Sequence, residues 1–160
     1  RAAERTFQLI MQVAGRAGRG EVPGEVVIQT FGPEHAAVLA AEANDYAMFY
    51  RDELRQREEL RYPPVGHLVS VMVTGKDEGK VKEKAADVTK ELAERLGEKE
   101  KVLGPAPARI VRARKMYRYR TVVKCEEVSS VTTAYKDVVR ELKLPRSVKV
   151  GIDVDPVAVD

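Results

Sequence analysis

The feature that most constrains the fold is the order of hydrophobic periodicities between residues 67 and 156. The alternating run HLVSVMVTG is followed by apolar residues at helical spacing, two β-rich runs, a second helical pattern and a last alternating run. Alternation at period two indicates a strand, and recurrence at three and four residues indicates a helix. The predicted class is therefore α+β. The order β-α-β-β-α-β is the split-βαβ or ferredoxin-like arrangement, with helices covering one face of an antiparallel sheet.

Capping residues place the elements of this region. Asp77 is suited to the N-cap of the first helix, and Gly97 to its C-terminal end. Ser129 or Ser130 would cap the second helix, which Pro145 closes. Between the helices, KVLGPAPARIVRARKM and YRYRTVVKC predict the two strands of a hairpin.

Residues 1–64 follow a different pattern, which predicts helix-strand-helix-helix. An amphipathic helix precedes the β-rich run EVVIQTF, which we predict to be a largely buried strand. Two helices follow, and the second begins after Asn44-Asp45. It ends before the YPP sequence, because a residue that precedes proline avoids the helical region. We therefore expect one part over residues 1–64 and a second domain over residues 65–160.

Composition narrows the classes of function. No stretch approaches the roughly 20 apolar residues of a membrane helix, and no signal-peptide pattern is present. The single cysteine, Cys125, cannot form an internal disulfide, so we expect a cytoplasmic protein and interpret Cys125 as a packing residue. Zinc-ligand spacing is absent, and no metal site is predicted. Because the sequence begins with Arg1 inside a helical pattern, we expect a C-terminal piece of a longer chain.

The segment QVAGRAGRG is the first candidate site. If the first helix continues to residue 19, Gln12, Arg16 and Arg19 share one face, and Gly15 lets a ligand approach closely. Two guanidinium groups on one face form a clamp for phosphate oxygens. Two alternatives stay open: a frayed glycine-rich end, and a phosphate cradle of glycine amides, which needs a preceding strand.

The hairpin is the second candidate site, because residues 101–125 contain no Asp or Glu. In RARKMYRYR the tyrosines alternate with arginines, so one side of the strand would stack on unpaired bases and the other would bind phosphates. The alternative is that the tyrosines pack in the core and the arginines protect an edge strand. The residues assigned to nucleic-acid contact are Arg109, Arg112, Arg114, Lys115, Tyr117, Arg118, Tyr119 and Arg120.

The same segments resemble a known family. QVAGRAGRG is similar to the sixth motif of superfamily 2 helicases, Q-x-x-G-R-x-G-R. ERTFQLIMQVAGRAGRGEVPGEVVIQTFGPEH, RYPPVGHL, VLGPAPA and IDVDP resemble, in order, the PriA or primosomal protein N′ family. The resemblance implies the C-terminal part of an ATP-dependent 3′-to-5′ DNA helicase. Such helicases recognise stalled replication forks and restart replication by primosome assembly.

By this resemblance, residues 1–64 end the second RecA-like helicase lobe, and residues 65–160 form a C-terminal ferredoxin-like domain. Arg16 and Arg19 would reach the ATP γ-phosphate as catalytic residues, with Arg19 the better candidate for the arginine finger. Gln12 and Gly15 would complete the nucleotide contact. The implied cofactors of the parent protein are ATP and Mg²⁺, with zinc in a cysteine-rich insertion that this chain lacks.

The resemblance also implies partners: forked and single-stranded DNA, primosome proteins, and the acidic tail of single-stranded-DNA-binding protein. Arg55, Arg57 and Arg61 are a candidate site for that tail. No membrane partner is expected. Because the chain lacks a P-loop, we predict that it hydrolyses no ATP alone. The main alternative is a stand-alone ferredoxin-like nucleic-acid-binding module without motor activity, and a third is a protein-docking module.

Overall fold

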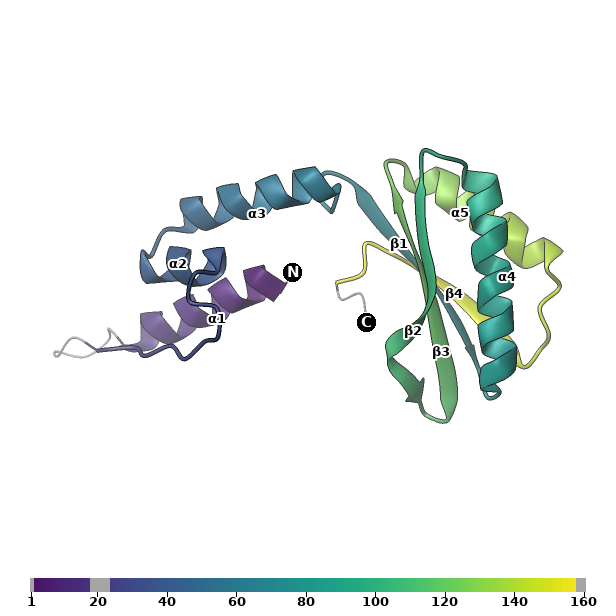
Figure 1. Cartoon of the computed structure of the whole chain (residues 1–160), viewed down its shortest axis with the longest axis horizontal. Helices are drawn as coiled ribbons and strands as arrows, with labels where there is room; N and C mark the ends of the chain where they lie inside the picture. Colours follow the sequence, from purple (N-terminus) through teal and green to yellow (C-terminus); the bar gives the residue numbers. More distant parts are fainter. Residues whose placement is uncertain (1, 18–23, 158–160) are drawn as a thin grey trace. The chain divides into compact units, whose positions relative to one another are not determined.

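The computed structural model describes residues 2–17 and 24–157 (Figure 1). Contacts divide the chain into two units, Arg1–Leu60 and Arg61–Asp160, close to the boundary predicted at residue 64. Each unit has a hydrophobic core of its own, and each is described by itself.

The first unit contains α1 (Ala2–Ala17), α2 (Ala36–Glu42) and α3 (Tyr46–Leu60). Its small core is built around Phe7 of α1, which stacks on Phe49 of α3 with ring centroids 4.5 Å apart. Three alanines of α2 complete the core and let the helices approach closely. As predicted, Asp45 caps α3, because its side chain accepts a hydrogen bond from the backbone N–H of Met48 at 2.9 Å.

The strand predicted for EVVIQTF is wrong. Residues 24–31 are outside any strand, and the side chains of Val27 and Phe31 are almost fully exposed. A strand needs a neighbouring strand to satisfy its backbone groups, and the described residues of this unit contain none. The β propensity of the run is therefore not enough to form the element.

The second unit has the predicted order of elements. It runs through β1 (His67–Gly75), α4 (Glu78–Leu96), β2 (Lys101–Ala113), β3 (Met116–Cys125), α5 (Val128–Glu141) and β4 (Val148–Val154). The strands form one antiparallel sheet in the order β2-β3-β1-β4. Helices α4 and α5 cover one face of this sheet (Figure 1). We call the other face, which neither helix covers, the open face.

Alternation along the strands divides the residues between the two faces. Val69, Val71 and Val73 of β1 face the helices and are almost completely buried. They pack with Val123 of β3 and Leu92 of α4. This packing stabilises the unit, since full burial of one such side chain contributes roughly 1.5–3 kcal/mol.

The ends of the two helices differ in their capping. Asp77 caps α4 as predicted, accepting from the N–H of Lys80 at 3.0 Å, and Gly97 ends the helix with a φ of 68°. The prediction of a serine cap for α5 is wrong, because the helix begins at Val128 and Glu127 occupies the N-cap. Ser130 instead donates a hydrogen bond to the carbonyl of Glu127 at 2.8 Å.

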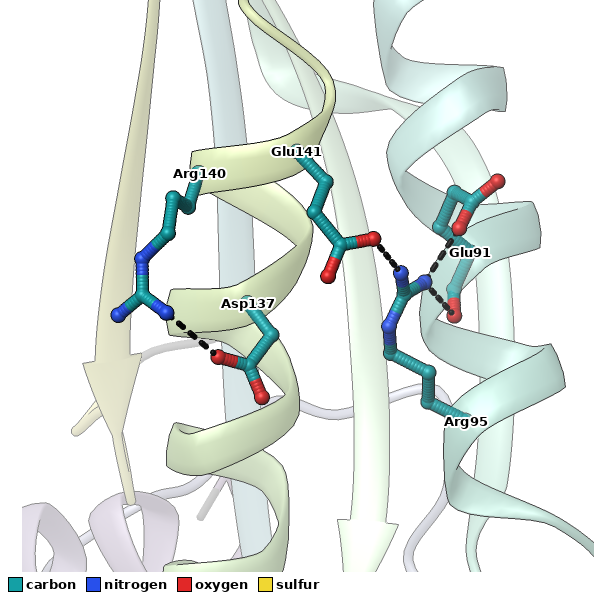
Figure 2. A network of polar contacts seen from close by, with 5 residues as sticks. All are labelled: Glu91, Arg95, Asp137, Arg140 and Glu141. Atoms are coloured by element: carbon teal, nitrogen blue, oxygen red, sulfur yellow. Dashed lines mark hydrogen bonds and ion pairs between the residues drawn. The ribbon is translucent and has the colours of Figure 1, made fainter.

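Ion pairs join the exposed surfaces of α4 and α5 (Figure 2). Arg95 of α4 contacts Glu91 on its own helix and Glu141 of α5 at 2.5 Å. The hydrogen bond with Glu91 raises the pKa of Arg95 above its ordinary value. A second pair, Arg140 with Asp137 at 3.4 Å, lies along α5. Surface pairs of this kind contribute little to stability, because water screens exposed charges.

A buried hydroxyl pair links α4 to β3 and leads to a stability prediction. Thr89 donates to the carbonyl of Ala85 at 2.7 Å, so Thr121 must donate the 2.5 Å bond between the two hydroxyls. Thr89→Val leaves the Thr121 hydroxyl buried without an acceptor, and we expect it to cost about 1–3 kcal/mol. Thr121→Val removes only a donor to Thr89, so its cost should be smaller. Urea unfolding of both variants measures this difference, and equal losses would contradict the assignment of donors.

Cys125 is a packing residue, as predicted. It is buried in the core of the second unit. Burial raises the pKa of its thiol to about 11, and the nearby carboxylates of Glu100 and Asp155 act in the same direction. Basic neighbours in the sequence would lower the pKa, but burial outweighs them.

Candidate nucleotide and nucleic-acid sites

The candidate phosphate clamp lies on the exposed side of α1. Gln12 and Arg16 are both exposed and one helical turn apart, so they share a side, while Phe7 is buried in the core. Within the described residues, Arg16 makes no hydrogen bond or ion pair. A Cβ atom added to Gly15 would meet nothing within 4 Å, so packing within the described chain does not require a glycine there.

Arg19 lies outside the described residues. The structure therefore brings together Gln12, Gly15 and Arg16 on one accessible surface, and the shared face with Arg19 stays a prediction. The exposed guanidinium of Arg16 is available to a phosphate, which a buried and ion-paired arginine would not be.

The hairpin strand β3 alternates as the sequence predicts. Arg118 and Arg120 point to the open face, whereas Tyr117 and Tyr119 point to the helices. Tyr119 is only 8% exposed, and its hydroxyl donates to Glu78 of α4 at 3.3 Å. Burial is the largest cause of its raised pKa. This burial argues against Tyr119 as a stacking platform, because packing against α4 occupies the ring.

Tyr117 is half-buried at the margin of the same core. The guanidinium of Arg112 lies over its ring, 5.2 Å from the centroid. Such cation–π contacts are worth about 0.5–1 kcal/mol at exposed sites. Arg112 therefore occupies one face of the Tyr117 ring, which also borders the core, so the tyrosines are not the part of the hairpin best placed to meet bases.

Edge protection does not explain the arginines of β3. This strand pairs with both β1 and β2, so it is a central strand of the sheet. Charges that protect an edge are needed only where backbone groups are unpaired. The strand β2 lies at one edge of the sheet, so protection remains a sufficient explanation for Arg109 and Arg112.

The turn of the hairpin holds two cations in strained backbone. Arg114 and Lys115 have φ values of 50° and 64°. Turns with positive φ at both central positions strongly favour Asn-Gly, because the left-handed region costs an L-residue roughly 1–2 kcal/mol. The turn therefore holds two long cationic side chains in a backbone conformation that Asn-Gly adopts at lower cost.

The open face carries further cations that the site assignment from sequence missed. Lys101 of β2 and Lys124 of β3 lie directly opposite each other in the register. Like charges at such positions are destabilising, and an anionic ligand would relieve the repulsion. The signal was present in the sequence, since the period-two alternation that selects Arg118 and Arg120 continues to Lys124. Asp153, on the far strand β4, adds a carboxylate to this face.

The candidate site for an acidic tail receives little support. The arginines are all ion-paired: Arg55 with Glu59, Arg57 with Glu4 and Glu53, and Arg61 with Glu126. A peptide carboxylate would have to displace these partners before it could bind.

Among residues 2–17 and 24–157, no cluster of His, Cys, Asp and Glu could hold a metal ion, and no helix is long and apolar enough to cross a membrane. The carboxylate of Asp155 makes two contacts with the start of β1. It accepts from the N–H of Leu68 at 2.9 Å and lies 2.7 Å from Nδ1 of His67.

Comparison with known proteins identifies the family. Residues 58–157 match the family described as the primosomal protein N C-terminal domain. The chain belongs to this family. The replication restart protein PriA of Synechocystis sp. is 42% identical over the whole chain, and that of Bacillus subtilis is 36% identical over 98% of it. The chain spans about a fifth of the length of these relatives (19% and 20%). The resemblance to PriA is thereby confirmed.

Proposed function

We propose that the chain is part of an ATP-dependent 3′-to-5′ DNA helicase that recognises stalled replication forks and restarts replication through primosome assembly. Its second unit binds forked or single-stranded DNA through the open face and the hairpin turn. The observation that carries this proposal is the placement of Arg118 and Arg120 on the open face of a central strand, where protection of a sheet edge does not account for them. Membership of the primosomal protein N family agrees with it.

The finer parts of the proposal follow from the resemblance. Residues 65–160 are a ferredoxin-like domain, and residues 1–64 end a RecA-like lobe. In the parent protein Arg16 and Arg19 act on ATP held with Mg²⁺, and zinc belongs to a cysteine-rich region outside this chain. Primosome proteins and the tail of single-stranded-DNA-binding protein are its protein partners, and the cytoplasm is its compartment.

Salt dependence of DNA binding tests the proposal. Binding to backbone phosphates releases counterions, so affinity falls with salt at a slope of about −0.7 per neutralised phosphate of a single strand. With three contacts, raising salt from 50 to 200 mM should weaken binding of a labelled single strand by about 20-fold. Fluorescence anisotropy with the 160-residue chain measures this loss. An affinity that does not change with salt would refute binding through the basic surface.

The alternative function, a nucleic-acid-binding module without motor activity, predicts the same salt dependence. The two functions differ at α1, since a passive binding module has no need of Gln12 and an exposed Arg16 on one helical side. We favour the motor because these residues lie on the accessible surface of α1, where a nucleotide phosphate can be met.

A further inference from the structure

A pocket of about 290 Å³ lies in the open face of the sheet. Its lining is apolar on one side, with Leu68 of β1, Leu103 of β2, Val122 of β3 and the ring of Tyr62. Arg120 and Lys124 add two cations to the same lining. The ammonium of Lys124 lies over the Tyr62 ring, 4.0 Å from its centroid, so one face of this ring is already occupied and Tyr62 contributes a wall of the pocket beside a cation.

A β-bulge forms the pocket. Leu103 pairs with Val122 and Ala106 with Arg120, so β2 has one residue more than β3 over this stretch. A bulge bends its strand and redirects its side chains. Gly104 lies in the bulge with a φ of 117°, and a Cβ atom there would be 2.9 Å from the carbonyl oxygen of Arg120. The sequence thus places a glycine where the bend requires one.

We propose that this pocket accepts one unpaired base of a single-stranded nucleic acid. The inference rests on the proposed function and names the form of nucleic acid that the open face binds. Leu103 is 39% exposed, so the apolar lining meets solvent and gains from being covered by a planar ring. Arg120 and Lys124 belong to the same lining, so both cations are close enough to attract the phosphates next to such a base.

The size and position of the pocket favour a single strand over a duplex. Its volume lies near the lower end of the roughly 300–1,000 Å³ typical of ligand pockets, which suits one base rather than a base pair. In a duplex the faces of each base are stacked on their neighbours, whereas single strands can turn bases outward onto aromatic and apolar side chains.

An acidic peptide with an apolar side chain is the competing occupant. The cations favour nucleic acid because they continue beyond the pocket, through Arg118 on the same face of β3 to Arg114 and Lys115 at the turn. A peptide side chain with one neighbouring carboxylate would contact only the pocket, whereas a polyanion would contact all the cations along β3 and at the turn.

The affinities of the 160-residue chain for two labelled strands test the proposal. One ligand is a labelled thymidine decamer, and the other has the same backbone with abasic residues. We expect the wild-type chain to bind the thymidine strand about 10-fold more tightly, because stacking contributes to each bound base. Leu103→Ser and Tyr62→Ala should bring this ratio below about twofold while leaving affinity for the abasic strand unchanged. Ile110→Ser, an exposed apolar residue of the same strand outside the pocket lining, should retain the full ratio.

The outcomes separate the two proposals. Binding that shows no preference for bases overturns the pocket assignment alone, whereas absence of salt-dependent binding to either strand overturns the proposed function as well. If Leu103→Ser lowers the affinity for both strands equally and also lowers the unfolding midpoint, Tyr62→Ala decides. A full preference for the thymidine strand in that variant overturns the proposal. If an acidic peptide binds with dependence on Leu103 and the thymidine strand does not, the occupant is a peptide and the proposal is wrong.

Discussion

Alanine at Arg16 or Arg19 of the full-length parent is expected to lower DNA-stimulated ATP hydrolysis by about 10³-fold or more. Negative charge develops on the transferred phosphoryl group, and a guanidinium aimed at it stabilises the transition state more than the ground state. Arg16 is exposed on α1, so it is free to meet a nucleotide held by the rest of the parent. Steady-state phosphate release at saturating ATP and DNA measures the effect.

Controls on the same helix make this result specific. Arg5 is also an exposed arginine of α1 but lies about three turns before Arg16, and Arg5→Ala should keep the rate within about twofold. Binding of a fluorescent ATP analogue should change little in Arg16→Ala, because the loss lies in the transition state. Hydrolysis at the wild-type rate in both Arg16→Ala and Arg19→Ala would remove the basis of the phosphate clamp.

The secondary structure of the second unit was easier to predict than that of the first, because its strands and helices find all their packing and pairing partners within the unit. Each strand from His67 to Val154 finds its partners within the same hundred residues, and each helix buries its apolar side on that sheet. Local periodicity therefore agrees with the global fold. The run EVVIQTF has equal β propensity, but a strand also requires pairing partners, which are a property of the surroundings.

The alternation of tyrosines and arginines along β3 could be predicted from the sequence. Which of the two faces is covered by the helices could not. The sequence places Tyr119 and Arg120 on opposite faces of β3, but period two alone does not say which face α4 and α5 cover. The larger gain from burying an aromatic ring turned Tyr119 inward and left the arginines on the open face. The pocket depends on a bulge at Gly104 and on the approach of Tyr62, more than 40 residues away in the chain. Neither the bulge nor the approach of Tyr62 produces a periodic pattern in the sequence.

Removing positive charge from the open face should strongly weaken the binding of single-stranded DNA. Three cations of this face, all on β3, are replaced together in the variant Arg118→Gln, Arg120→Gln and Lys124→Gln. We expect the affinity of the 160-residue chain for a labelled single strand at 50 mM salt to fall about 100-fold, and the salt slope to fall by about 2 in magnitude. Glutamine keeps most of each side-chain stem on the sheet, so packing is largely retained while the charge is removed. Anisotropy titrations over a series of salt concentrations give both quantities.

A matched variant separates local contact from overall charge. Its three exposed lysines lie on the helices of the covered side: Lys80→Gln, Lys82→Gln and Lys136→Gln. It lowers the net charge by the same amount, yet it should weaken binding by less than about threefold, because charges beyond roughly 10 Å are screened at 0.1 M salt. Equal losses in the two triple variants would mean that DNA responds to the charge of the whole unit. The open face would then have no particular part in binding, and the row of cations along β3 would need another explanation.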